Sequence, residues 1–321
     1  MRYLHSAILT IALVMGHVPA SAQGYPAKPV RLVVPFTPGA SNDVLSRAAA
    51  LGMAPGLGQT VVVDNRPGAG GMIGAEHVAR AEPDGYTILN IQASFATNAA
   101  LRAKMPYDTA RDFAYIGMMA KGPMLVTVHP SMPVQSVKAL VQLVKTRPGQ
   151  LNYGSSGNGG INHLSTELFR KMAGIDIVHV PYKGIALAIT DLIGGHVQLV
   201  ITSLPSAHTQ VKAGRLKALA VGSAQRTTFA PEIPTVSESG VPGYVAELWW
   251  GLAAPARVPP DIVNRLAAEL NRTLQSADTR QRFANEGAEP MPLTREQFAA
   301  FVQNEITRWR QVARDAHLQP D

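Results

Sequence analysis

Two short segments of small and hydroxyl-bearing residues are where this sequence could bind an anion. Residues 36–43 read FTPGASND, and residues 153–160 read YGSSGNGG. The first segment follows the apolar run at residues 30–34 and precedes a helical pattern, and the second is likewise predicted to be a turn between a strand and a helix. The first N–H groups of a helix have no partner within the helix, and they attract negative charge. Both turns could therefore bind a group such as a carboxylate.

Taken alone, the first turn is better explained as an ordinary connection, because Ser41 or Asp43 could simply cap the following helix. The second turn favours ligand binding, because its glycines and small side chains let backbone N–H groups approach a ligand closely. Ligands of open α/β sheets bind beyond the carboxyl ends of the strands, which is where both turns are predicted to lie. If the turns belong to different lobes, they face each other across a cleft.

Motifs for covalent or redox chemistry are incomplete in this sequence. Residues 154–158 read GSSGN, with Asn158 where the nucleophile elbow of a hydrolase needs glycine. The glycine pairs at 68–70 and 157–159 are followed by Ile73 and Asn162, where a dinucleotide-binding fingerprint needs a third glycine. There is no cysteine, and the nine histidines show no metal-binding spacing. We expect no catalytic residues, cofactor or metal; an exported hydrolase or isomerase on a similar α/β scaffold is the alternative.

Three further features keep more than one interpretation. Lys183 could face a cleft, or it could lie on the surface after a buried strand. Residues 65–71, NRPGAGG, are explained by a tight turn without a ligand. Trp249 and Trp250 are predicted to pack in the core or at a hinge.

The elements that must position the turns alternate between strands and helices. Such alternation is typical of parallel sheets with helices on both faces. Near the C-terminus, Thr294 and Gln297 form the pattern of a capping box before a long amphipathic helix. The predicted strands are residues 30–34, 60–63, 86–91, 125–128, 177–180, 197–201 and 216–221. The predicted helices are residues 41–57, 72–81, 136–146, 161–173, 184–193 and 260–275.

Residues 1–22 have the layout of a secretory signal peptide. A nine-residue apolar run, AILTIALVM, precedes the sequence ASA at residues 20–22, which is the small-x-small pattern of a cleavage site. A membrane-spanning helix needs about 20 apolar residues, so this run is too short to remain in a bilayer. We expect cleavage after Ala22 and a mature chain that begins at Gln23 in the periplasm.

The remaining chain is long enough for two domains. The 321-residue sequence is 46% hydrophobic and carries a formal charge of +7, spread without basic runs, so we expect no nucleic-acid groove. We predict one lobe from residues 23–123 and 249–321 and a second lobe from residues 124–248. Two crossing segments would form a hinge on which the lobes close. We expect a monomer.

The order of motifs along the chain resembles one known family, the substrate-binding proteins of tripartite tricarboxylate transporters, also called Bug proteins. The resemblance implies a two-lobed periplasmic-binding-protein (Venus flytrap) fold with a cleft between two mixed or parallel sheets. It also implies a periplasmic receptor for a small carboxylate, with integral-membrane permease subunits as partners. The matching segments are YPAKPVR at 25–31, PFTPG at 35–39, VDNRPGAGG at 63–71, DGYT at 84–87, LNYGSSG at 151–157, HVPYKG at 179–184, KAGRL at 212–216, PTV at 234–236 and WWG at 249–251.

The resemblance places carboxylate-binding loops at the two turns described above. The sequence departs from the family at Ala40, where a second glycine is usual, and at Gln198 and Thr202, near which an acidic residue is frequent. A buried ammonium group needs an acidic partner, so these neutral residues predict a carboxylic acid without an amine. The candidate ligand-binding residues are Phe36, Pro38, Gly39, Ala40, Ser41, Asn42, Asp43, Ser94, Ser155, Ser156, Gly157, Asn158, Thr202 and Ser203.

Overall fold

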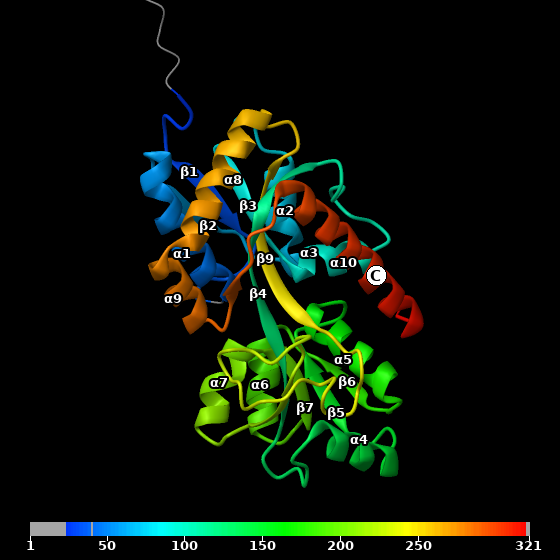
Figure 1. Ribbon diagram of the computed structural model, residues 1–321. Helices are drawn as coiled ribbons and strands as arrows, with labels where there is room; N and C mark the ends of the chain where they lie inside the picture. The colour runs from blue at the N-terminus through cyan, green and yellow to red at the C-terminus, as the bar shows by residue number, and fades with distance from the viewer. Residues whose placement is uncertain (1–23, 40, 319–321) are drawn as a thin grey trace, which may run out of the picture.

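The computed structural model describes residues 24–39 and 41–318, which form two α/β lobes joined at a narrow waist (Figure 1). The predicted signal peptide and the candidate residue Ala40 lie outside the described residues. Within the described ranges, no helix combines the length and the apolar character needed to cross a membrane. The α/β class and the two-lobed fold predicted from the sequence are confirmed.

The N-terminal lobe is built on a mixed sheet in the order β2-β1-β3-β9-β4, with the short β10 paired to β4. Strands β1, β2 and β3 are parallel, and β9 runs antiparallel to β3 and β4. The strands are β1 (Val30–Val34), β2 (Val61–Asn65), β3 (Thr87–Gln92), β4 (Phe113–Val128), β9 (Glu247–Pro255) and β10 (Glu289–Pro290). The helices are α1 (Ser41–Leu57), α2 (Met72–Ala79), α3 (Ala93–Leu101), α8 (Pro260–Gln275), α9 (Ala277–Asn285) and α10 (Arg295–Asp315), with a 3-10 turn at Ala69–Gly71.

The central lobe contains a second mixed sheet. Strand β5 is parallel to β6 and β7, and the second half of β4 runs antiparallel to β7 and β8. The strands are β5 (Asn152–Ser155), β6 (Val178–Pro181), β7 (Leu199–Ser203) and β8 (Lys217–Val221). The helices are α4 (Val137–Thr146), α5 (Ile161–Ala173), α6 (Ile185–Ile193) and α7 (Leu204–Lys212).

Strand β4 belongs to both sheets and forms one side of the waist. Its pairing with β9 ends at Pro123, and its pairing with β7 begins at Met124. Beside it, the Gly222 N–H donates to the Met124 carbonyl at 2.7 Å, and the Ala246 N–H donates to the Gly222 carbonyl at 2.7 Å. Strand β4 therefore changes sheet between Pro123 and Met124; the division of the chain into lobes at residues 123/124 and 248/249 remains a prediction.

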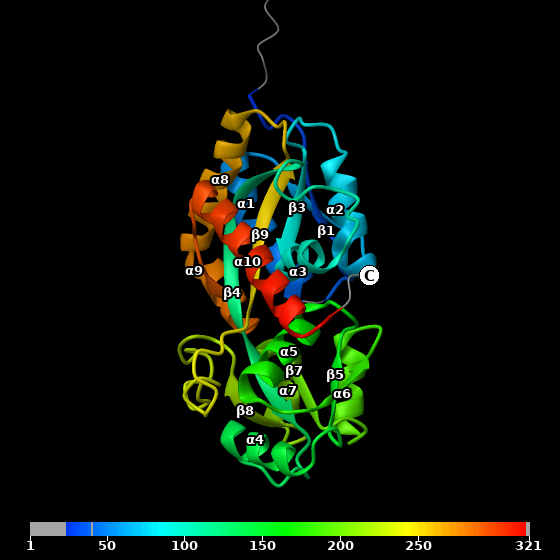
Figure 2. The same ribbon diagram turned by 90° about the vertical axis from the view of Figure 1, so that its right-hand side faces the viewer.

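The C-terminal helix α10 lies across the N-terminal lobe (Figure 2). The predicted capping box is confirmed: the Gln297 N–H donates to the Thr294 side chain, and the Gln297 side chain accepts from the Thr294 N–H. Trp309 in α10 and Trp249 in β9 both donate indole N–H groups to the buried Glu305 carboxylate, at 3.0 and 3.2 Å. Trp249 is therefore a core residue, as one of its two interpretations predicted.

The sequence prediction was wrong about the length of one strand. Residues 125–128 are only the end of β4, which has 16 residues and begins at Phe113. Gly117, Gly122 and Pro123 interrupt the apolar pattern of its first part, and all three residues are disfavoured within strands. The nine-residue helices α3, α7 and α9 were also missed.

Candidate functional site

A cavity of about 560 Å³ lies between the two lobes, and both predicted turns contribute to its lining. We call it the cleft. Eight of the candidate residues line it: Phe36, Ser41, Asn42, Ser94, Ser156, Asn158, Thr202 and Ser203.

In the part of the chain that the structure describes, six helices begin at the cleft. The parallel strands β1, β2, β3, β5, β6 and β7 each end there, and the helix that follows each strand starts within the lining. The lining contains the first helical residues or the caps of α1, α2, α3, α5, α6 and α7, which include Ser41, Gly71, Gln92, Gly160, Gly184 and Ser203.

Five of the six described helices that begin at the cleft lack side-chain caps. None of the cap residues of α2, α3, α5, α6 and α7 accepts a hydrogen bond with its side chain, and the residue before α1, Ala40, lies outside the described residues. Of the four described helices that start away from the cleft, α4, α9 and α10 are capped by Ser136, Ser276 and Thr294, and α8 starts after Pro259 without a side-chain cap. The uncapped N–H groups give the cleft a positive potential that favours an anion.

The charged side chains of the cleft have the same sign. Among the described residues, its lining contains Arg102 and Lys183 but no aspartate or glutamate. Of the two interpretations of Lys183, the structure supports the one in which it faces the cleft. Such a lining attracts negative charge and offers no partner to a buried ammonium group.

Asp43 supports the first turn and does not line the cleft. Its carboxylate accepts hydrogen bonds from the Gly39 N–H at 3.0 Å, from the Asn65 amide at 3.0 Å and from Arg47 at 2.9 Å. Burial raises the pKa of the Asp43 carboxyl, but these hydrogen bonds outweigh burial and hold the pKa below its ordinary value. The neighbouring candidates Pro38 and Gly39 are exposed outside the lining, and Gly39 has a left-handed φ of 83°.

Ser155 lies behind the second turn rather than in the cleft. Its side chain is fully buried, and its Oγ lies 2.6 Å from His179 Nε2 and accepts the Gly157 N–H at 3.1 Å. Gly157 also stays outside the lining and has a φ of 115° that only glycine adopts readily. Ser155 and Gly157 therefore shape the turn that presents Ser156 and Asn158.

Two buried amide side chains, one in each wall of the cleft, bond to other residues of the same wall. The Trp250 indole N–H donates to Asn42 Oδ1 at 2.5 Å, so this tryptophan lines the cleft as well as packing in the core. On the other wall, Asn162 accepts the Ser156 hydroxyl at 2.8 Å and donates to the Ile201 carbonyl at 2.9 Å. Gln198, one of the departures from the family pattern, stays outside the lining and bonds the Asn152 N–H at 2.9 Å.

The glycine-rich segment 67–71 also lines the cleft, although the sequence analysis explained it without a ligand. It follows β2 and precedes α2, so it has the same strand–turn–helix pattern that identified the other two turns. That pattern was the signal that could have found it. Gln92, Asn98, Asn162, Ile185, Ser206 and Leu248 are further lining residues that the sequence analysis missed.

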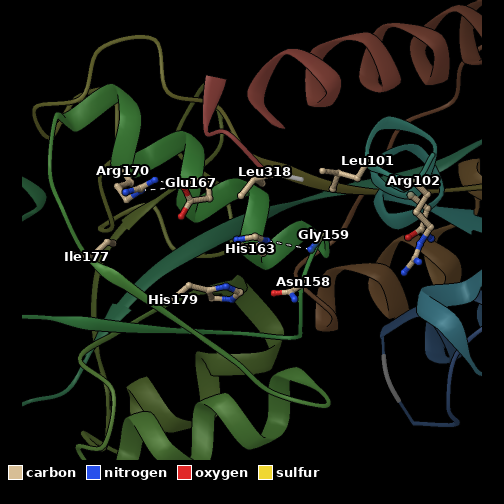
Figure 3. Close-up of a pocket in the computed structure, with 11 residues that line it drawn as sticks. Leu101, Arg102, Asn158, Gly159, His163, Glu167, Arg170, Ile177, His179 and Leu318 are labelled. Atoms are coloured by element: carbon tan, nitrogen blue, oxygen red, sulfur yellow. Dashed lines mark hydrogen bonds and ion pairs between the residues drawn. The ribbon is translucent and has the colours of Figure 1, made fainter. Parts of the chain in front are cut away.

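A second cavity of about 390 Å³, which we call the rear cavity, adjoins the cleft (Figure 3). Leu101 at the end of α3 and the following Arg102 lie on one side, and His163, Glu167 and Arg170 of α5 lie on the other. Asn98, Arg102 and Asn158 line both cavities, so they form the boundary between them.

The chain is similar to proteins of one family along most of its length. Residues 45–318 match the model of the family described as "Tripartite tricarboxylate transporter family receptor". Protein BugT of Bordetella pertussis is 38% identical over 299 residues, which cover 92% of each chain. The structure of R. palustris Rpa4515 with adipate is similar with a TM-score of 0.86 and 38% identity, over 92% of this chain and 100% of that one. The structure of MatC from Rhodopseudomonas palustris with bound malate has a TM-score of 0.80 and 31% identity, over 90% and 99% of the two chains.

Proposed function

This chain belongs to the tripartite tricarboxylate transporter receptor family, and we propose that it captures a small organic carboxylate without an amine group between its lobes. The observation that carries the proposal is the cleft lined by helix N-termini from both lobes and, among the described residues, by no acidic side chain. The adipate and malate bound by two similar structures support the same ligand class.

The cleft offers hydrogen-bond donors of the kind that carboxylate oxygens accept. The starts of α1 and α5 come from opposite lobes, α5 has no side-chain cap, and the hydroxyls of Ser41 and Ser203 lie in the same lining. Hydrogen bonds from such donors to a charged acceptor are shorter and stronger than neutral ones. An amino acid would have to leave its ammonium unpaired, because Asp43 is already engaged by Arg47.

A receptor accounts for the site better than a hydrolase or isomerase does. Ser155 and His179 have the separation of a nucleophile and its base, at 2.6 Å, but the Ser155 hydroxyl is fully buried outside the cleft. Burial and the neighbouring His163 lower the pKa of His179 to about 4, which makes it a weak base at neutral pH. The pair is therefore suited to supporting the turn.

The proposed setting is the periplasm, with membrane permease subunits as partners. The predicted signal peptide and the membership of a transporter receptor family support this setting. Closure of the two lobes about the waist would then signal the loaded state to the permease.

Calorimetry on the mature chain tests the function. We expect saturable binding of adipate or malate, and weaker binding of aspartate and glutamate. A thermal-shift screen supplies an independent readout, because a ligand at 100 times its Kd stabilises the folded state by about 2.7 kcal/mol. Tighter binding of aspartate would contradict the absence of an ammonium partner, and turnover of any bound acid would favour the enzyme.

A further inference from the structure

One cation at the boundary between the cleft and the rear cavity has no role in the site described so far. Arg102 is the residue directly after α3, and it lines both cavities. Ser94, Asn98 and Arg102 follow each other at intervals of four residues, which places them on one face of the helix. This face runs from the cleft, where Ser94 lies, to the rear cavity.

Arg102 differs from the other arginine of the rear cavity in its partners. Arg170 forms ion pairs with Glu167 at 2.8 Å and with Asp176 at 3.6 Å, and Glu167 also accepts the Tyr153 hydroxyl at 2.6 Å. Among the described residues, no ion pair joins Arg102 to an acidic side chain. Figure 3 shows Arg102 across the cavity from the paired Glu167 and Arg170.

We propose that Arg102 binds the second carboxylate of a dicarboxylate whose first carboxylate lies at the helix N-termini of the cleft. This inference rests on the proposed function and names the ligand class more closely. A guanidinium presents two parallel N–H donors that match a carboxylate, so it selects for a second anionic end and not merely for a longer chain.

The rear cavity provides room behind this contact. Its walls include the apolar side chains of Leu101, Ile177 and Leu318. The methylene groups of a diacid that spans from the helix N-termini to Arg102 lie on the cleft side of this boundary, where Phe36, Ile161 and Leu248 are among the lining residues. Lys183 is the other cation of the cleft, but it is exposed on the loop before α6 and lies outside the rear cavity.

A pair of ligands that differ in one carboxylate tests the inference. Adipate and hexanoate have six carbons each, but only adipate has a second anionic end. We expect Arg102→Gln to weaken adipate binding by about tenfold or more and hexanoate binding by less than about threefold, measured by calorimetry. Arg102→Lys, which keeps the charge and loses the two-pronged geometry, should lie between wild type and Arg102→Gln for adipate.

Lys183→Gln is the matched control, because it removes one positive charge from the same cleft. It should leave the ratio of adipate to hexanoate affinity within about threefold of wild type. An equal change of this ratio in both glutamine variants would mean a general electrostatic effect and would overturn the role of Arg102. A change in Lys183→Gln alone would place the second carboxylate elsewhere and also overturn it.

The failure of this inference is distinguishable from failure of the proposed function. If the wild type binds hexanoate as tightly as adipate, the function stands and the second-carboxylate site is wrong. If the wild type binds no carboxylate in the screen, the proposed function itself fails, and the inference fails with it. Arg102→Gln and Arg102→Lys should unfold at the same temperature as the wild type. This control shows that any loss of binding is not caused by misfolding.

Discussion

His163 and His179 stack face to face beneath the second turn, with ring centroids 4.0 Å apart and ring planes 8° apart. His163 Nδ1 accepts the Gly159 N–H at 3.1 Å, and His179 Nε2 lies 2.6 Å from the Ser155 hydroxyl. Both rings therefore support the turn from below. The His163 hydrogen bond requires an unprotonated Nδ1, and two charged rings at this distance would repel each other.

From the stacked pair we predict that the free energy of unfolding falls in acid. The pKa of His179 in the folded protein is about 4, below its ordinary 6.5, because burial and His163 oppose its charge. Folding therefore favours the neutral ring, so this contribution is complete above pH 6.5 and is lost as the pH falls toward 4. We expect a loss of roughly 1–2 kcal/mol in the free energy of unfolding between pH 7 and pH 4.5, after allowance for partial exposure of the ring.

Urea unfolding at several pH values checks this expectation. Other groups near the pair include Glu167, Arg170 and Tyr153, and many carboxyl groups elsewhere titrate in the same range. His179→Gln isolates the ring, because it should be less stable at pH 7 and should lose less stability toward pH 4.5 than the wild type. Parallel pH profiles of the two proteins would contradict the assignment to His179.

A second prediction concerns the backbone of the first turn. Gly39 has a φ of 83°, and a Cβ there would meet no atom within 4 Å, so a substitution causes backbone strain without a clash. Left-handed geometry costs an L-residue roughly 1–2 kcal/mol and more for a β-branched one. We expect Gly39→Val to abolish measurable carboxylate binding and Ala40→Gly to leave it nearly intact. Equal effects of the two changes in calorimetry would refute the reliance of the turn on Gly39.

A third prediction separates the two adjacent tryptophans. Trp250→Phe removes the indole N–H that donates to Asn42 Oδ1 at the cleft wall, so we expect several-fold weaker ligand binding together with lower stability. Trp249→Phe is the control, because Glu305 keeps its hydrogen bond from Trp309 and the cleft is untouched. This variant should change the unfolding midpoint but not the Kd. Equal loss of affinity in both variants would show that Trp250 acts only through packing.

A fourth prediction concerns the waist. A Cβ on Gly222 would lie 2.6 Å from the Ala246 carbonyl oxygen, in the hydrogen-bonded contact beside Met124. Gly222→Ala should therefore cost roughly 1–3 kcal/mol of stability and should reduce closure of the lobes. In small-angle scattering, we expect saturating ligand to shrink the radius of gyration of the wild type more than that of Gly222→Ala.

Gly24→Ala provides the matched control for the waist, because a Cβ at Gly24 meets no atom within 4 Å. It should reproduce both the wild-type stability and the wild-type closure. A wild-type radius of gyration that does not change at saturation would refute closure on binding.

The α/β class and the two turns could be predicted because local patterns encode them, whereas the two-lobed arrangement was predicted from the chain length, the crossing segments and the resemblance to the family. Helices such as residues 161–173 have clear periodicity and a start marked by glycine, and their boundaries agree with the structure. The first part of β4 lacked such a pattern, because it is buried along nearly its whole length and contains Gly117, Gly122 and Pro123. Burial on both faces removes the alternation of polar and apolar residues that identifies a strand.

Long-range contacts decided the parts of the site that the sequence analysis missed. Asn42 meets Trp250 across 208 positions, and Asn98 donates to the Gly70 carbonyl at 3.0 Å across 28 positions. Neither pairing follows from local spacing. The inward direction of the Ser155 hydroxyl likewise depends on His179 in a neighbouring strand, which a reading of the turn alone does not supply.

The uncapped helix starts at the cleft also bear on how this protein can be engineered. The residue at the cap of α3 is Gln92, which does not cap the helix with its side chain. At the start of an ordinary helix, introducing a capping residue such as aspartate adds about 0.5–2 kcal/mol of stability. Here the new carboxylate would occupy the same N–H groups as the ligand and repel its charge. A library of variants selected for thermal stability alone would thus accumulate capping residues at these positions and lose ligand binding. A capping side chain and the ligand need the same backbone N–H donors.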